Sequence, residues 1–111
     1  MDYPVTTLGN VAIVMLSGYI DMYYTPDARR IILRCLSDKH SVLVDLSGVT
    51  YIDSSGIGEL VSAFTTVRNG GGELKLLNLT KKVHDLLQIT KLYTVFDIKD
   101  DEANAIQSFT K

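Results

Sequence analysis

The sequence predicts an α/β domain built on a mixed sheet of about five strands, with about four helices. Three observations lead to this fold class. Two short apolar stretches meet across Gly9 and Asn10, which is typical of a β-hairpin. From residue 41 onward, apolar runs of strand character alternate with amphipathic stretches of helical period. This alternation predicts parallel strands joined by right-handed crossovers, so the sheet is antiparallel at the hairpin and parallel thereafter.

The N-terminal hairpin joins a strand over residues 5–8 to one over residues 11–16, and Gly18 is predicted to end the second strand. A helix follows, with Thr25 as its N-cap and Pro26 as its first helical residue. Its apolar residues fall on one buried stripe, formed by Ala28, Ile31, Ile32, Cys35 and Leu36. The place of Cys35 on this stripe indicates a structural thiol rather than a reactive one.

Two strand–helix pairs follow. The apolar run over residues 42–46 suits a strand covered on both faces. A helix then begins near Ser54 or Ser55 and ends at the Gly-rich residues 69–72. Its apolar face holds Ile57, Leu60, Val61, Phe64, and Val67 or Arg68.

The last elements are shorter. Residues 73–78 form a strand, and Thr80 caps a third helix. The stripe of that helix is Val83, Leu86 and Leu87, with Leu92 packed at its end. Residues 95–98 are predicted to form the final strand. The final helix starts near Asp100, where the acidic residues complement the positive end of the helix dipole.

Length and composition restrict the class of protein. The 111 residues, of which 46% are hydrophobic and 22% charged, predict one globular domain over residues 1–111 and exclude a disordered chain. The net charge of −2 argues against a nucleic-acid-binding domain. We read the one basic cluster, Arg29, Arg30 and Arg34, as the solvated face of a helix. No metal site is expected, because the chain has a single cysteine and no clustered ligand motif.

The cysteine count and the apolar runs also indicate the cellular compartment. A single cysteine forms no internal disulfide, which favours a reducing compartment, and we expect the cytoplasm. The longest apolar run, over residues 11–16, is far shorter than the ~20 residues of a membrane-spanning helix. The first basic residue is Arg29, so we expect no signal peptide.

The most informative stretch is residues 45–58, where a strand ends, a short loop turns and a helix starts on Asp53, Ser54, Ser55 and Gly56. Gly56 and Gly58 fall in the first turn of this helix, where each costs about 1 kcal/mol relative to alanine. Either a partner surface or phosphate group approaches closely there, or the helix packs closely against its own sheet. The spacing favours neither explanation over the other.

The two serines also admit two interpretations. In the structural one, Asp53 or Ser54 is the N-cap and the neighbouring serine fills an exposed helix start. In the functional one, a serine hydroxyl at a helix N-terminus is phosphorylated. The phosphate adds about 1.5–2 negative charges beside free N–H groups, so the helix tolerates it while a docked partner does not.

The motifs of this sequence and their order resemble those of the STAS domain family, and more narrowly those of the bacterial anti-sigma factor antagonists. The resemblance rests on residues 16–21, the Thr25–Pro26 helix start, residues 44–47 and the Asp-Ser-Ser-Gly-Ile-Gly element at 53–58. It covers nearly the full chain, and the last element is its specific part. Tyr19 departs from the family pattern, in which this position is often charged, so details of the partner are expected to differ.

The resemblance implies a phosphorylation switch. The implied target is Ser55, in preference to Ser54. The implied kinase is a GHKL-type serine kinase that is also the anti-sigma factor, and a PPM-type phosphatase reverses the modification. The unphosphorylated protein binds that kinase and frees the sigma factor. Asp21 and Asp53 map to acidic family residues near the partner surface. The implied partner-binding set is Asp21, Asp53, Ser54, Ser55, Gly56, Ile57 and Gly58. No cofactor is implied, and we expect a monomer when the protein is free.

Two other interpretations compete. As an enzyme, the chain would use Ser55 as nucleophile, His84 as base and Asp45 as orienting acid, but the Gly-x-Ser-x-Gly pattern is absent and we expect no enzyme. His84 is predicted to be a surface helix residue and His40 a turn residue. The closer rival is a STAS subunit of a stressosome-like scaffold or of a lipid-transport ATPase complex, which would bind permanently.

Overall fold

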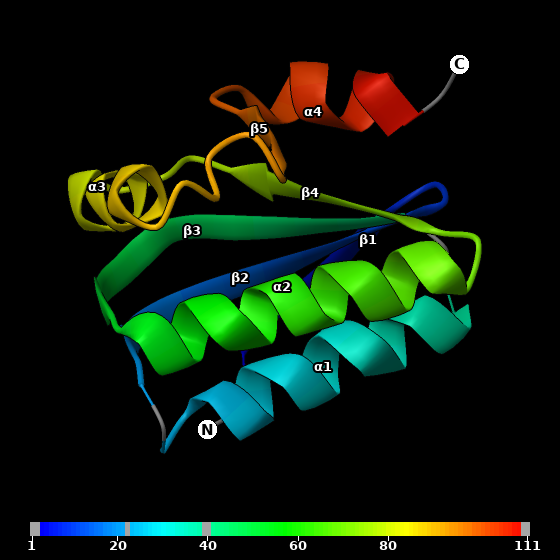
Figure 1. The fold of residues 1–111 in the computed structure, drawn as a ribbon. Coiled ribbons are helices and arrows are strands. Elements are labelled where there is room, and N and C mark those ends of the chain that lie inside the picture. The colour runs from blue at the N-terminus through cyan, green and yellow to red at the C-terminus, as the bar shows by residue number, and fades with distance from the viewer. Residues whose placement is uncertain (1–2, 22, 39–40, 110–111) are drawn as a thin grey trace.

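The structure is a computed structural model that describes residues 3–21, 23–38 and 41–109. In these residues it contains five strands and four helices (Figure 1). The strands are β1 (Val5–Leu8), β2 (Val11–Ile20), β3 (Ser41–Ile52), β4 (Glu73–Leu77) and β5 (Asp97–Lys99). The helices are α1 (Thr25–Asp38), α2 (Ser54–Asn69), α3 (Lys81–Ile89) and α4 (Glu102–Phe109).

The five strands form one mixed sheet in the order β1-β2-β3-β4-β5. β1 pairs antiparallel with β2, and the pairs β2–β3, β3–β4 and β4–β5 are all parallel. The predicted fold class is therefore confirmed, including the hairpin and the switch to parallel pairing. Chain order equals strand order because each helical crossover returns the chain to the adjacent position in the sheet.

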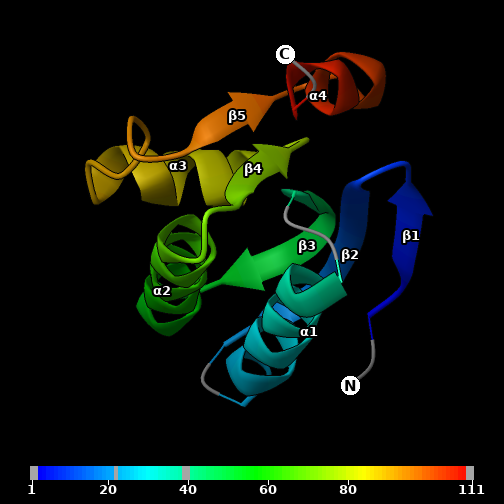
Figure 2. The same cartoon turned by 90° about the vertical axis from the view of Figure 1, so that its right-hand side faces the viewer.

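Helices cover both faces of the sheet. α1 and α2 lie side by side on one face, and α4 lies on the other (Figure 2). The larger core cluster joins the first face to α1, α2 and α3, while a smaller one holds Val11, Ile13, Leu43 and Leu77 against Ala105 of α4. No helix in the described part of the chain is both long and apolar enough to cross a membrane.

The strand ends differ from the prediction. β2 continues through Gly18 to Ile20, and β3 continues to Ile52 through the stretch predicted as a loop. Gly18 has a φ of +73° and sits next to a shift in the β2–β3 register, so it bends the strand instead of ending it. The two strands remain paired across this irregularity, which local composition does not reveal.

The observed starts of the helices agree with the prediction in one case and differ from it in others. Thr25 is the first residue of α1 rather than its cap, and the Tyr24 carbonyl accepts the N–H of Ala28 at 3.2 Å. Thr80 caps α3 as predicted, with its side chain accepting from Val83. α4 begins at Glu102, two residues after the predicted start near Asp100. β5 lies over residues 97–99 rather than 95–98.

Several single-residue predictions can be checked directly. Cys35 is buried, at 7% exposed, as the α1 stripe predicted. Arg29, Arg30 and Arg34 are all exposed, which confirms a solvated helix face. Gly70 follows the last residue of α2, as the Gly-rich helix end predicted. His40 lies outside the described residues.

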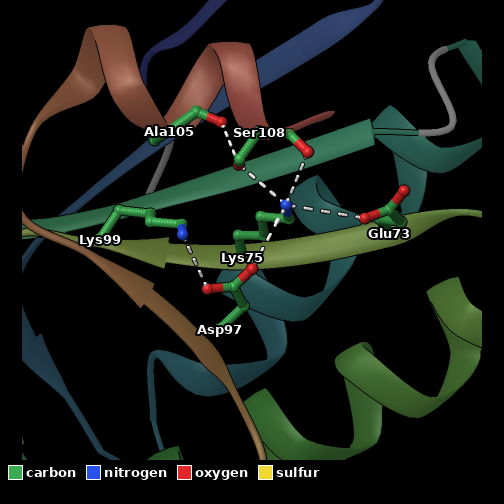
Figure 3. A network of polar contacts seen from close by, with 6 residues as sticks. All are labelled: Glu73, Lys75, Asp97, Lys99, Ala105 and Ser108. Carbon is green, nitrogen blue, oxygen red and sulfur yellow. Dashed lines mark hydrogen bonds and ion pairs between the residues drawn. The ribbon is translucent and has the colours of Figure 1, made fainter. Parts of the chain in front are cut away.

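The sequence did not predict a buried lysine in β4. Lys75 is 5% exposed, and its ammonium group donates to the carbonyl and the hydroxyl of Ser108 in α4 at 3.0 and 2.8 Å (Figure 3). Asp97 of β5 lies 3.3 Å away, Glu73 lies 3.8 Å away, and the Phe109 ring lies 4.7 Å from the nitrogen. This Lys75 cluster attaches α4 to β4 and β5.

Candidate functional site

The motif at residues 53–58 lies at the carboxyl ends of β2 and β3, where α2 begins (Figure 1). Ile20 and Ile52 are paired at the ends of their parallel strands. The Asp53 N–H donates to the Ile20 carbonyl at 3.4 Å. The start of α2 is therefore held beside the connection from β2 to α1, which carries Asp21.

Asp53 is the N-cap of α2. Its backbone is extended, and its carboxylate accepts the N–H of Gly56 at 3.0 Å. A carboxylate at this position satisfies a free N–H and complements the helix dipole. Ser54 and Ser55 are the first two residues of the helix and are both exposed. The cap is thus Asp53 and not Ser54, so neither serine hydroxyl is needed to start the helix.

The two glycines of the first turn have different roles. A Cβ on Gly56 would lie 2.5 Å from the Ile20 carbonyl oxygen and 2.7 Å from Cγ1 of Ile52, so any side chain would force this part of the fold apart. A Cβ on Gly58 would meet nothing within 4 Å. Close packing against the sheet therefore explains Gly56. Gly58 is exposed, and nothing within the described chain requires its lack of a side chain.

The remaining residues of the motif divide by burial. Ile57 is 2% exposed and belongs to the core between α2 and the sheet, so it positions the helix. Asp21 is half-buried, and its carboxylate accepts the Tyr23 N–H at 3.0 Å, which fixes the turn before α1. The accessible surface of the motif therefore consists of Ser54, Ser55 and Gly58, flanked by Asp53 and Asp21.

An interhelical ion pair lies beside this surface. Nε of Arg29 in α1 is 3.3 Å from Oε2 of Glu59 in α2, and the two side chains are 45% and 40% exposed. From the sequence, Arg29 was predicted only to lie on a solvated helix face, and Glu59 was not among the candidate residues. The available signal was the spacing of Glu59 four residues after Ser55, which places both on one side of the helix.

Two tyrosines mark the open part of the sheet next to the site. Tyr19 and Tyr51 are paired across β2 and β3, with ring centroids 5.5 Å apart and ring planes at 41°. They are 58% and 40% exposed. Tyr19, the departure from the family pattern, is therefore a surface residue with a tilted aromatic neighbour.

The alternative catalytic residues lie in separate local networks. Nδ1 of His84 is 3.6 Å from Asp85, and its ring meets Tyr93 edge-on, at 5.1 Å between centroids. Asp45 is buried in β3 and accepts the Ser47 N–H at 2.9 Å. Ser55 is exposed on α2. The structure thus does not assemble these three residues as a triad, and His84 is a partly exposed helix residue, as predicted.

The chemistry available at this surface is limited. It offers two exposed hydroxyls at a helix start, with acidic groups on either side. Within residues 3–21, 23–38 and 41–109, no three His, Cys, Asp or Glu side chains are grouped to hold a metal ion. The arrangement suits a hydroxyl that accepts a phosphoryl group and a surface that another protein contacts.

Comparison with known proteins adds three findings. The STAS domain family model matches residues 2–105. An anti-sigma-B factor antagonist of Bacillus subtilis is 33% identical over 94 residues, which cover 85% of this chain and 86% of that protein. An anti-sigma factor antagonist from Mycobacterium paratuberculosis has a structure with a TM-score of 0.87 at 20% identity, covering 98% of this chain and 93% of the other.

A further structural neighbour is known in two states. The anti-sigma factor antagonist SpoIIAA in its unphosphorylated form gives a TM-score of 0.79 at 18% identity, covering 96% of this chain and 94% of that one. The phosphorylated form of SpoIIAA, from Bacillus, gives 0.74 at 17% identity, covering 96% and 97%. At these identities the likeness establishes the shared fold alone.

Proposed function

The chain belongs to the STAS domain family, and on that premise we propose that it is an anti-sigma factor antagonist regulated by phosphorylation of Ser55. Taken as a single STAS domain over residues 1–111, it binds an anti-sigma factor in its unphosphorylated form and thereby frees the sigma factor. The relative from Bacillus subtilis, named as an anti-sigma-B factor antagonist, supports this role. Another relative, from Paenibacillus polymyxa, is named as an anti-sigma F factor antagonist, so the proposal covers the general role and no particular sigma factor.

The observation that carries the proposal is the exposed Ser55 hydroxyl beside an open Gly58. Because Asp53 caps α2, Ser55 is available for modification without loss of the helix start. A glycine at position 58 weakens the helix by about 1 kcal/mol relative to alanine, and no contact within the described chain compensates. Close approach of a partner to the first turn of α2 accounts for both features.

The modification is a phosphoryl transfer from ATP. The Ser55 oxygen forms a bond to the γ-phosphorus while the bond from that phosphorus to the oxygen bridging to ADP breaks. ADP leaves, and the hydroxyl proton passes to a base of the kinase. The kinase is a GHKL-type serine kinase that is also the anti-sigma factor, and a PPM-type phosphatase hydrolyses the phosphoserine. The chain itself supplies the acceptor hydroxyl and no catalytic group.

The phosphate acts by charge on a docked surface. It adds about 1.5–2 negative charges next to Asp53. Placing this charge against a desolvated partner surface is expected to cost several kcal/mol. Since every 1.4 kcal/mol is a factor of ten in affinity, a loss of about 3–4 kcal/mol weakens the complex by more than a hundredfold. Partner contacts fall on the exposed residues Ser54, Ser55 and Gly58, with Asp21 and Asp53 at the margin.

The test uses purified GHKL-type anti-sigma factors of the source organism, each incubated with this protein and ATP. Mass spectrometry should locate the phosphate on Ser55, and Ser55→Ala should abolish its incorporation while retaining binding to the same kinase. Ser55→Asp should weaken that binding by at least a hundredfold. Phosphate found only at another residue, or no phosphate with a kinase that binds, would overturn the proposal.

Gly58→Ala tests whether the partner contacts the first turn of α2. The extra methyl group stabilises the helix but obstructs a partner that contacts its first turn, so we expect a more stable protein that binds the kinase more weakly. Unchanged affinity for Gly58→Ala would move the contact away from this turn. A permanent scaffold subunit, the rival interpretation, would bind its partner equally well with or without phosphate on Ser55.

A further inference from the structure

The ion pair between Arg29 and Glu59 is unusual in one respect. Although the Glu59 side chain is 40% exposed, its Oε2 atom is buried and has no hydrogen-bond partner in the described part of the chain. The charge of that oxygen is balanced by Arg29, at 3.3 Å. Glu59 therefore holds the guanidinium group of α1 against the surface of α2.

The partner of this guanidinium group, Glu59, lies one helical turn after Ser55. Ser55 and Glu59 are four residues apart in α2, which places their Cβ atoms about 5–6 Å apart on one side of the helix. Helical side chains lean toward the helix N-terminus, which directs the Glu59 side chain toward the turn that contains Ser55. Arg29 and Glu59 also line one small cavity with Gly56, the residue after Ser55.

We propose that Arg29 is the positioning residue for phosphorylated Ser55, to which its guanidinium group transfers from Glu59. This inference rests on the proposed function, because it assumes that Ser55 carries the phosphate. A phosphate has about twice the charge of a carboxylate and three acceptor oxygens, and a guanidinium group can bind it through two parallel hydrogen bonds. The phosphate therefore outcompetes Glu59 for Arg29.

The exchange has consequences for both helices. Arg29 then joins α1 directly to the phosphorylated start of α2, so the phosphate is held in one orientation beside the small cavity that Arg29, Gly56 and Glu59 line. Glu59 loses its cation and is repelled by the phosphate, so its carboxylate turns toward solvent. A partner that docks on the first turn of α2 meets a fixed anion and a displaced Glu59 side chain.

The neighbouring arginines are not equivalent to Arg29. NH2 of Arg30 lies 3.0 Å from Asp27, three residues earlier in the same helix, and this pair stays within α1. Arg30 is exposed, as Arg29 is, and it carries the same charge. Arg30→Gln is therefore a matched control, since it removes one positive charge from α1 without removing the contact with α2.

The experiment installs phosphoserine at position 55 during translation, so it needs no kinase, and follows the phosphate by ³¹P NMR as pH is varied. The second pKa of a free phosphoserine is about 6. Asp53 and Glu59 raise it in every variant that retains them, whereas a bound guanidinium group lowers it. We expect Arg29→Gln to raise this pKa by at least about half a unit, Arg29→Lys to restore part of the difference, and Arg30→Gln to leave it unchanged.

Equal pKa values for the parent, Arg29→Gln and Arg30→Gln would overturn the inference. Should Arg29→Gln fold poorly, the Arg29 Nε–H resonance of the parent protein answers the same question. It should shift between the Ser55 and phosphoserine forms, and a resonance that stays in place would contradict the exchange. Because the phosphate is installed directly, failure of every kinase to modify Ser55 would count against the proposed function and not against this result.

Discussion

Two polar clusters in this protein each combine a cation, a carboxylate and a serine but differ in burial. The Lys75 cluster joins a cation to a serine and two carboxylates, and the lysine side chain is only 7% exposed. At the start of α2, Arg29 and Glu59 form an ion pair one helical turn from Ser55. There the cation is 45% exposed, and the serine is accessible.

The difference shows what burial does to polar groups. The Lys75 ammonium has three hydrogens, and oxygens of Ser108, Asp97 and Glu73 surround it, so no donor is left for another ligand. An exposed ion pair contributes only about 0–1 kcal/mol. Arg29 can therefore leave Glu59 at little cost when the Glu59 carboxylate, whose Oε2 atom is buried in the pair, turns toward solvent. The first cluster holds the fold together, whereas the second can respond to a new charge.

Lys75→Ala should produce the largest effect, a loss of about 3 kcal/mol in the free energy of unfolding. The change removes the contacts with Ser108 and leaves a gap beneath Phe109, so α4 loses its attachment. Urea unfolding followed by circular dichroism measures the loss. Lys99→Ala is the control, because Lys99 is one-third exposed and pairs only with Asp97 among the described residues. A loss as small as that of the control would mean that the buried cluster does not stabilise the fold.

Gly56→Ala and Gly58→Ala should have opposite effects on stability. The first places a methyl group against the Ile20 carbonyl and should cost about 2 kcal/mol. The second adds an alanine to an open helix position and should stabilise by about 0.5–1 kcal/mol. Thermal unfolding of the two variants distinguishes them. Equal shifts would show that the close packing at Gly56 is not the reason for a glycine there.

Asp53→Ala should lower stability by about 1 kcal/mol, because the Gly56 N–H loses its acceptor. Asp53→Asn retains a capping oxygen and should recover most of the loss. Hydrogen exchange of the first-turn amides of α2 locates the effect. If Asp53→Ala and Asp53→Asn destabilise equally, the carboxylate charge matters more than the cap.

The pH dependence of stability should depend on Asp97. Burial raises the pKa of this carboxyl, but hydrogen bonds from Lys75 and Lys99 outweigh that effect and hold the pKa below its ordinary value of 3.8. Because the folded pKa is the lower one, the contribution to stability is present above about pH 4 and is lost as pH falls through the folded pKa. Thermal unfolding between pH 2 and pH 6 should show a smaller loss for Asp97→Asn than for the parent. Parallel curves would contradict the assignment.

Ser55→Ala should have the smallest effect on stability, within about 0.5 kcal/mol, because the hydroxyl is exposed and does not cap α2. Urea unfolding of this variant beside Lys75→Ala tests the contrast between the clusters most directly. A loss above about 1 kcal/mol would make Ser55 a structural residue and weaken its assignment as a modified one.

The fold could be predicted from the sequence largely because side-chain periodicity reports which face of each element is buried. The α1 stripe and the alternation after residue 41 gave the helices and the parallel strands. The ends of β2 and β3 could not be predicted, because Gly18 bends a strand whose continuation depends on pairing with a distant segment. Lys75 was missed for a similar reason, since Ser108, which follows it by 33 residues, covers it.

The candidate site shows the same limit. The sequence singled out Asp53, Ser54 and Ser55 because capping and the placement of a hydroxyl at a helix start depend on local chemistry, and the structure confirms Asp53 as the cap. It did not explain why positions 56 and 58 are glycines, because the close contact of Gly56 is with Ile20, a residue on another element. The Arg29–Glu59 pair could not be predicted either, because it depends on how α1 and α2 lie against each other.

The single cysteine has a practical consequence. Cys35 lies in the core between α1 and the sheet, at 7% exposed, and the chain has no other thiol. A thiol reagent can therefore reach the protein at one position, and only when α1 separates from the strands beneath it. The labelling rate would then measure how often that separation occurs. Compared between the Ser55 and phosphoserine forms, it would report whether modification at the start of α2 changes the opening of its neighbour.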